Sequence, residues 1–164
     1  MTPKTKEIVR RIKKRIERQR SVLDIGSLDI NGSVKDIFED AERYVGVDIV
    51  SGSNVDMVMN AHKLKFDKES FDCVLALGLF EHDNAWWKSL EEIKRVLKHK
   101  GWFILQVPTI VDSHNPPDYW RFTKQGVKEI MKDFKNVKII KYYRNIYDFK
   151  YLRFVRYVAY GQKP

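Results

Sequence analysis

Five apolar runs that lack strict alternation of polar and apolar residues constrain the fold of this chain most strongly. Strands that are covered by helices on both faces have this pattern, because neither face then needs polar side chains. Such strands are typical of a parallel sheet. The five runs are residues 21–26, 44–50, 55–61, 71–80 and 101–108.

Segments with helical periodicity separate or flank these runs, and they are residues 4–20, 33–44, 84–101 and 121–134. Ser33 and Thr123 are suitable N-caps, because their hydroxyl groups can accept hydrogen bonds from free backbone N–H groups. Gly101 is a suitable stop for the third helix. The alternation of strands and helices predicts a doubly wound α/β fold of the Rossmann-like type.

The chain changes character after residue 135. Residues 137–145 and 151–162 are β-rich runs without a helix between them, which predicts a C-terminal antiparallel hairpin. With the five earlier runs, the prediction is a mostly parallel sheet of seven strands. Only seven residues separate Asp48 from Asp56. The third strand should therefore be short, or it should follow a bare loop.

The length of 164 residues predicts a single domain of residues 1–164. In it, a basic N-terminal helix (1–20) and the closing hairpin (135–164) flank a central core (21–134). No stretch approaches the roughly 20 apolar residues of a membrane span, so we expect a cytoplasmic protein without membrane contact. The single cysteine, Cys73, lies in an apolar run, and we expect neither a disulfide nor a metal site.

The net charge of +9 is concentrated at the two ends of the chain. Residues 1–20 hold nine Lys/Arg against two acids, whereas residues 21–134 hold fourteen against nineteen. A uniformly basic nucleic-acid-binding surface is therefore not expected. Cations and aromatic residues alternate in residues 141–160, which would suit single-stranded nucleic acid, but cross-strand packing is favoured. A monomer or a homodimer is expected.

The loop after the first run carries two glycines, in VLDIGSLDING at residues 22–32. In a doubly wound sheet, ligands bind beyond the carboxyl ends of the strands, where this loop lies. Gly26 and Gly32 let the backbone approach a ligand closely. Asp48 ends the second run, 22 residues after Gly26. A carboxylate at that point suits two ribose hydroxyls, so a nucleoside is the expected ligand.

The same loop favours a cationic ligand over a dinucleotide. Its two glycines are separated by five residues, without the close triplet of a dinucleotide fingerprint, and Asp29 would repel a pyrophosphate. An ammonium or sulfonium group would instead be attracted. A nicotinamide-dependent oxidoreductase is disfavoured for this reason, and also because no sequence is left for a substrate domain.

Several motifs, in this order, resemble the class I S-adenosylmethionine-dependent methyltransferases, in particular the type 11 methyltransferase-domain group. The resemblance covers residues 21–134 and implies a cofactor-binding core there. VLDIGSLDINGSV and YVGVDI resemble the first two family motifs, FDCVLALGLFEHD the fourth-strand motif, and RVLKHKGWFILQVP and HNPPDYWRFT two later segments. The activity implied is transfer of a methyl group, with S-adenosylmethionine as the cofactor.

The resemblance also implies which residues bind that cofactor. Those on its methionine side would be Asp24, Gly26, Ser27 and Gly32. Asp48 would hold the ribose, and Ile49 would pack on the adenine. Further contacts with the adenine or the methionine would come from Asn60, Ala61, His62, Leu77, Gly78 and Leu79.

Two departures from the family pattern leave a second function open. Ser27 and Leu28 replace the usual second glycine, and Asn60 stands where the family often has Asp. The alternative is a noncatalytic module of the same fold, which binds RNA or a protein partner through its basic termini.

Candidate residues for the acceptor side follow the fourth and fifth runs. His82 and His114 are candidate bases, because only imidazole titrates near neutral pH without help. Glu81, Tyr119 and Arg121 are candidate substrate-binding residues. A structural role for Glu81, with His82 solvated, stays equally open, and the sequence does not identify the acceptor.

Overall fold

The computed structural model describes residues 2–16, 19–30, 32–110, 116–144 and 154–164. Within these residues, seven strands form one sheet in the order β3-β2-β1-β4-β5-β7-β6. Pairing is parallel from β3 to β5, whereas β7 pairs antiparallel with both β5 and β6. The strands are β1 (Ser21–Ile25), β2 (Arg43–Asp48), β3 (Met57–Val58), β4 (Phe71–Leu77), β5 (Leu97–Ile110), β6 (Lys135–Arg144) and β7 (Phe154–Gln162).

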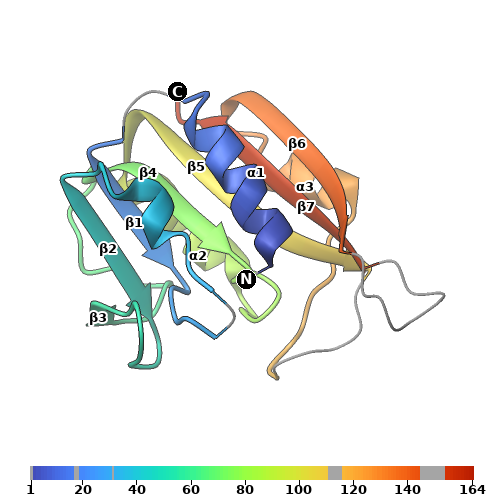
Figure 1. Ribbon diagram of the computed structural model, residues 1–164, viewed down its shortest axis with the longest axis horizontal. Coiled ribbons are helices and arrows are strands. Elements are labelled where there is room, and N and C mark those ends of the chain that lie inside the picture. Colours follow the sequence, from blue (N-terminus) through green and yellow to red (C-terminus); the bar gives the residue numbers. More distant parts are fainter. Residues whose placement is uncertain (1, 17–18, 31, 111–115, 145–153) are drawn as a thin grey trace.

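Helices cover both faces of this sheet (Figure 1). The helix α1 (Pro3–Lys13) and the 3-10 turn η1 (Lys35–Phe38) pack on one face, in a core that includes Ile12. The helices α2 (Trp86–Val96) and α3 (Lys124–Ile130) pack on the other, in a core that includes Ile93. The prediction of a doubly wound, mostly parallel sheet with a C-terminal antiparallel hairpin is confirmed.

The register of the central strands brings their carboxyl ends to one edge. Ile25 of β1 is level with Val47 of β2 and with Ala76 of β4, and Ala76 is level with Leu105 of β5. The loops after these strands therefore leave the sheet side by side. The expected short third strand is found, since β3 has only two residues and follows a bare loop.

The helix predicted for residues 33–44 is wrong, because only η1 forms there. Ile37 and Phe38 are buried by this single turn, so a longer helix is not needed to cover the sheet. The chain then has to enter β2 at Arg43. Ser33 still accepts a hydrogen bond from the backbone N–H of Lys35 (3.0 Å), although η1 has no side-chain cap.

The predicted end of the third helix at Gly101 is also wrong. The helix α2 ends at Val96, and Gly101 lies inside β5. Leu97 falls within the segment predicted to be helical (84–101), but it adopts an extended conformation and pairs with Phe71 of β4. Tertiary pairing thus outweighs the helical spacing of this fully buried residue.

Threonine side chains form the N-caps of α3 and α1. Thr123 caps α3 by accepting from the N–H of Gly126 (3.1 Å), as predicted. Thr2 caps α1 in the same way, and the hydroxyl groups of Thr5 and Tyr142 are 2.6 Å apart, which ties α1 to β6. Among the described residues, no helix has the length and apolar character to cross a bilayer.

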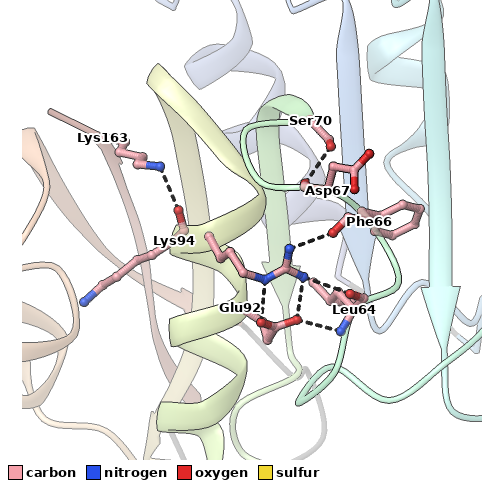
Figure 2. Close-up of polar contacts among 8 residues, drawn as sticks. Leu64, Phe66, Asp67, Ser70, Glu92, Lys94 and Lys163 are labelled. Atoms are coloured by element: carbon pink, nitrogen blue, oxygen red, sulfur yellow. Dashed lines mark hydrogen bonds and ion pairs between the residues drawn. The ribbon is translucent and has the colours of Figure 1, made fainter.

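A charged cluster ties α2 to the loop that precedes β4 (Figure 2). Arg95 donates to the carbonyl oxygens of Phe66 (2.6 Å) and Leu64 (2.8 Å) and forms an ion pair with Glu92. Glu92 accepts in turn from the N–H of Leu64 (2.7 Å). These contacts fix the segment that returns from β3 to the amino end of β4, where the ring of Phe66 packs on that of Phe71.

Candidate functional site

A cavity of about 710 Å³ lies at the carboxyl edge of the parallel strands. Its volume is within the range of ligand pockets, about 300–1,000 Å³. The loops after β1, β2, β3 and β4 contribute to its wall, together with residues of β5 and β7. The predicted site residues that line it are Gly26, Asp48, Ile49, Asn60, Ala61, His62, Leu77, Gly78, Leu79, Glu81, His82 and Tyr119.

The turn after β1 is built around Gly26. Its φ of +77° is unfavourable for other residues, and an added Cβ would lie 3.3 Å from the side chain of Leu79. Its N–H donates to the carbonyl oxygen of Val47 (2.8 Å). The backbone therefore passes close to both β2 and the loop after β4. The loop after β1, the end of β2 and the loop after β4 thus lie together at the cavity.

Asp48 is held by the same turn. One carboxylate oxygen accepts from the N–H of Leu28, and the other from the N–H of Val50, both at 3.2 Å. Each carboxylate oxygen has further lone pairs, and Asp48 lines the cavity. It can therefore accept hydrogen bonds from ligand hydroxyl groups. Beside it, Ile49 is 68% exposed and offers an apolar surface for a planar ring.

The residues after β3 form the wall next to Asp48. The side-chain oxygen of Asn60 accepts from the N–H of His62 (2.8 Å). The Nε2 atom of His62 is 2.7 Å from a carboxylate oxygen of Asp83, which also accepts from the N–H of Ala85 (2.9 Å). This network joins the loop after β3 to the loop before α2.

Three predicted cofactor residues are not among the residues that line the cavity. Asp24 is buried and accepts from the hydroxyl of Tyr44 (2.7 Å), and burial raises its pKa to about 6. The hydroxyl of Ser27 donates to the carbonyl oxygen of Asn54 (2.9 Å). The N–H of Gly32 donates to Asp29 (2.5 Å). The structure gives these residues roles in shaping the loops.

Two predicted acceptor-side residues, Arg121 and His114, are not found at the cavity among the described residues. Arg121 forms a two-pronged ion pair with Asp118 (2.6 Å for both contacts) and does not line the cavity. His114 lies outside the described residues. The neighbouring segment does reach the site, because Tyr119 donates its N–H to the carbonyl oxygen of Glu81 (2.7 Å). The ring of His82 contacts the carbonyl oxygen of Pro117 (2.7 Å).

Several residues that line the cavity are not among those predicted from the sequence. Gln106 of β5 and Arg156 of β7 line it, as do Thr2 and Pro3 at the start of α1. Gln106 stands as a polar residue in an apolar run, and Arg156 is one of the cations that alternate with aromatic residues in residues 141–160. As a polar residue in a buried strand, Gln106 could therefore have been recognised as a site candidate.

Glu81 is the most buried charged residue of the cavity, with 1% of its surface exposed. Burial raises the pKa of its carboxyl group, and the guanidinium of Arg156, with Nη1 3.9 Å from Oε1, opposes that rise. Its second oxygen, Oε2, has no hydrogen-bond partner among the described residues. Within the same residues, no group of His, Cys, Asp and Glu side chains is arranged to hold a metal ion.

Known structures share this fold from end to end. The YcgJ protein of Bacillus subtilis is 15% identical, with a TM-score of 0.81 over 99% of both chains. A SAM-dependent methyltransferase of Archaeoglobus fulgidus is 16% identical, with a TM-score of 0.72 over 96% of this chain and 94% of the other. The 1,6-didemethyltoxoflavin-N1-methyltransferase of Burkholderia thailandensis, solved with S-adenosylhomocysteine, is 18% identical, with a TM-score of 0.67 over 99% and 78%.

The sequence itself also matches a family model. No curated protein matches the chain, but the model described as a methyltransferase domain matches residues 19–105, which is more than half of the chain. The matched segment contains β1, the Gly26 turn, Asp48 and β4, which are the elements that build the cavity. The chain therefore belongs to the methyltransferase domain family.

Proposed function

We propose that the chain transfers a methyl group from S-adenosylmethionine to an acceptor by direct in-line displacement. The observation that carries this proposal is a single cavity in which the Gly26 turn and the Asp48 carboxylate face the same space. The two are joined by backbone contacts, since Leu28 donates to Asp48. The acceptor side of the cavity lies beyond them, along β4, β5 and β7.

The chemistry of the cavity residues fits this cofactor. Asp48 would bind the ribose hydroxyls, and the exposed side chain of Ile49 would cover the adenine ring. The backbone at Gly26 and Gly78 would leave room for the amino-acid part.

The protein has little covalent chemistry to perform in such a reaction. When bound, the cofactor supplies a methyl group that its sulfonium already activates. The contribution of the chain would be to align the acceptor and to keep water out. Tyr119 and Pro117 contact the segment of Glu81 and His82, and Thr2 also lines the cavity. His82 is the candidate to hold a proton that the acceptor loses.

Calorimetric titration tests this proposal directly. S-adenosylmethionine and S-adenosylhomocysteine should both bind saturably, and NAD⁺ should not. Asp48→Asn should weaken binding by about tenfold or more, since it removes charged hydrogen bonds to the ribose. Asp133→Asn is the matched control, because Asp133 is exposed near the end of α3, where it pairs with Lys94.

Absence of heat with both cofactor forms, up to millimolar concentration, would contradict the proposal. If generic RNA then gave a salt-dependent gel shift, the noncatalytic alternative would be the better account.

The single, buried cysteine fits a reducing compartment, and we propose the cytoplasm as the location of the protein.

A further inference from the structure

Three polar side chains, each more than nine-tenths buried, line the end of the cavity opposite Asp48. Glu81 (1% exposed) follows β4, Gln106 (3%) lies on β5, and Arg156 (8%) lies on β7. In the strand order β2-β1-β4-β5-β7, the strands β4, β5 and β7 lie two, three and four strand spacings from β2, which carries Asp48; these separations are roughly 10, 14 and 19 Å. The two ends of the cavity can therefore bind different molecules or different parts of one.

The three side chains form one connected cluster. The Nη1 atom of Arg156 is 3.9 Å from Oε1 of Glu81. With its amide oxygen facing the guanidinium, Gln106 accepts from the same Nη1 atom (3.1 Å) and from the N–H of Val107 (3.2 Å). The cluster pairs one negative with one positive group, so it carries no net charge when both are ionised.

Two polar atoms of this cluster are left without a partner among the described residues. They are Oε2 of Glu81, which accepts hydrogen bonds, and Nε of Arg156, which donates one. Buried polar atoms without partners are rare in folded proteins, because each costs about 1–3 kcal/mol of desolvation. Both residues line the cavity and lie next to each other, so a ligand with a donor beside an acceptor would offer a partner to each side chain.

Gly78 keeps this cluster accessible from the cofactor side of the cavity. A Cβ atom at position 78 would lie 3.4 Å from Oε1 of Glu81 and 3.7 Å from the side-chain amide of Gln106. The space that a side chain would fill stays open between the backbone and the cluster. A group placed next to the cofactor can therefore approach Glu81.

We propose that this end of the cavity is the acceptor subsite, and that it binds a neutral group with a hydrogen-bond donor beside an acceptor, such as the edge of an amide or a lactam. The donor would face Glu81, and the acceptor would face Arg156. A carboxylate would be repelled by Glu81, and an ammonium group by Arg156. This inference rests on the proposed function, because it assigns the remaining end of the cavity to the cofactor.

Ligand-observed NMR on protein saturated with S-adenosylhomocysteine tests the inference with four small probes. The 2-pyridone ring presents a donor beside an acceptor, whereas N-methyl-2-pyridone has the same shape without the donor. Benzoate and benzylamine supply an anion and a cation of similar size. Saturable magnetisation transfer is expected for 2-pyridone, with at least tenfold weaker binding of the other three.

Variants should remove this preference without removing the cofactor. Glu81→Gln should weaken 2-pyridone binding about tenfold to a hundredfold, as expected for a lost hydrogen bond to a charged group. Should this variant fail to fold, Glu81→Leu with Arg156→Met replaces both members of the buried pair, a change that proteins often tolerate. Glu129→Gln, which is exposed on α3 and paired with Lys132, is the matched control.

The outcomes separate this inference from the proposed function. If S-adenosylhomocysteine gives no heat in calorimetry, the proposed function and this inference both fail. If it binds, and 2-pyridone binds no better than N-methyl-2-pyridone, benzoate or benzylamine, the inference alone is overturned. Undiminished 2-pyridone binding in the Glu81→Gln variant, or in the double variant, would overturn it as well.

Discussion

Replacing Asp24 by Asn should stabilise the protein at neutral pH. Asp24 is 6% exposed, and its pKa is raised from 3.8 to about 6, mainly by burial. The hydrogen bond from Tyr44 partly offsets that rise, and the nearby charge of Asp48 adds to it. The ionised carboxylate is thus less favourable in the folded protein than in the unfolded chain.

The magnitude follows from the two pKa values. Because the folded pKa is the higher one, the stability linked to this group is complete below pH 3.8 and is lost as the pH rises through about 6. Each pH unit between the two values corresponds to about 1.4 kcal/mol, so ionised Asp24 costs at most about 3 kcal/mol. The side-chain amide of the variant would bury an N–H group without a partner, which reduces the gain in stability by about 1 kcal/mol. The expected net gain at pH 7.5 is about 1–2 kcal/mol.

Urea unfolding of wild type and Asp24→Asn at pH 7.5 and pH 4.5 measures this gain. The variant should be more stable at pH 7.5, and the difference should shrink or change sign at pH 4.5. Tyr44→Phe is the control, because it removes the hydrogen bond to the carboxylate and should destabilise the protein at pH 7.5. An Asp24→Asn variant that is less stable than wild type at pH 7.5, or a difference independent of pH, would refute the reasoning.

Three further substitutions test the frame of the site. Gly26→Ala should cost about 1–2 kcal/mol of unfolding free energy, because an L-residue is strained at positive φ, and it should weaken binding of S-adenosylhomocysteine in calorimetry. Arg95→Gln should lower the urea midpoint by an amount equivalent to about 1–2 kcal/mol after allowance for its partial exposure; unchanged hydrogen exchange at Leu64 would contradict the role of Arg95. Thr123→Ala should lower the melting temperature through loss of about 1 kcal/mol from the α3 cap, and Thr123→Ser should retain most of it.

Much of the fold could be predicted from the sequence, because buried strands and their turns leave local signals. The apolar runs identified the parallel strands, and the change of pattern after residue 135 identified the hairpin. The helix at residues 33–44 could not be predicted correctly. The apolar residues Ile37 and Phe38 have the same spacing in a single turn as in a longer helix. The position at which the chain must enter β2 determines that only one turn forms.

The candidate site was predictable where one loop carries the signal. Gly26 and Asp48 stand at the ends of neighbouring strands, and parallel pairing places such ends together. Arg156 could not be assigned in the same way, because it lies more than 100 residues from both along the chain. It reaches the site only because β7 inserts between β5 and β6. Asp24 was expected to face the ligand, but the alternation of side chains along β1 turns it toward Tyr44.

A crystal structure with S-adenosylhomocysteine tests the central claim most directly. The account predicts the ribose hydroxyls within hydrogen-bond distance of the Asp48 carboxylate, the adenine against Ile49, and the sulfur atom on the side of Gly78. A ligand bound away from the carboxyl edge of the sheet, or a ribose that does not contact Asp48, would contradict it.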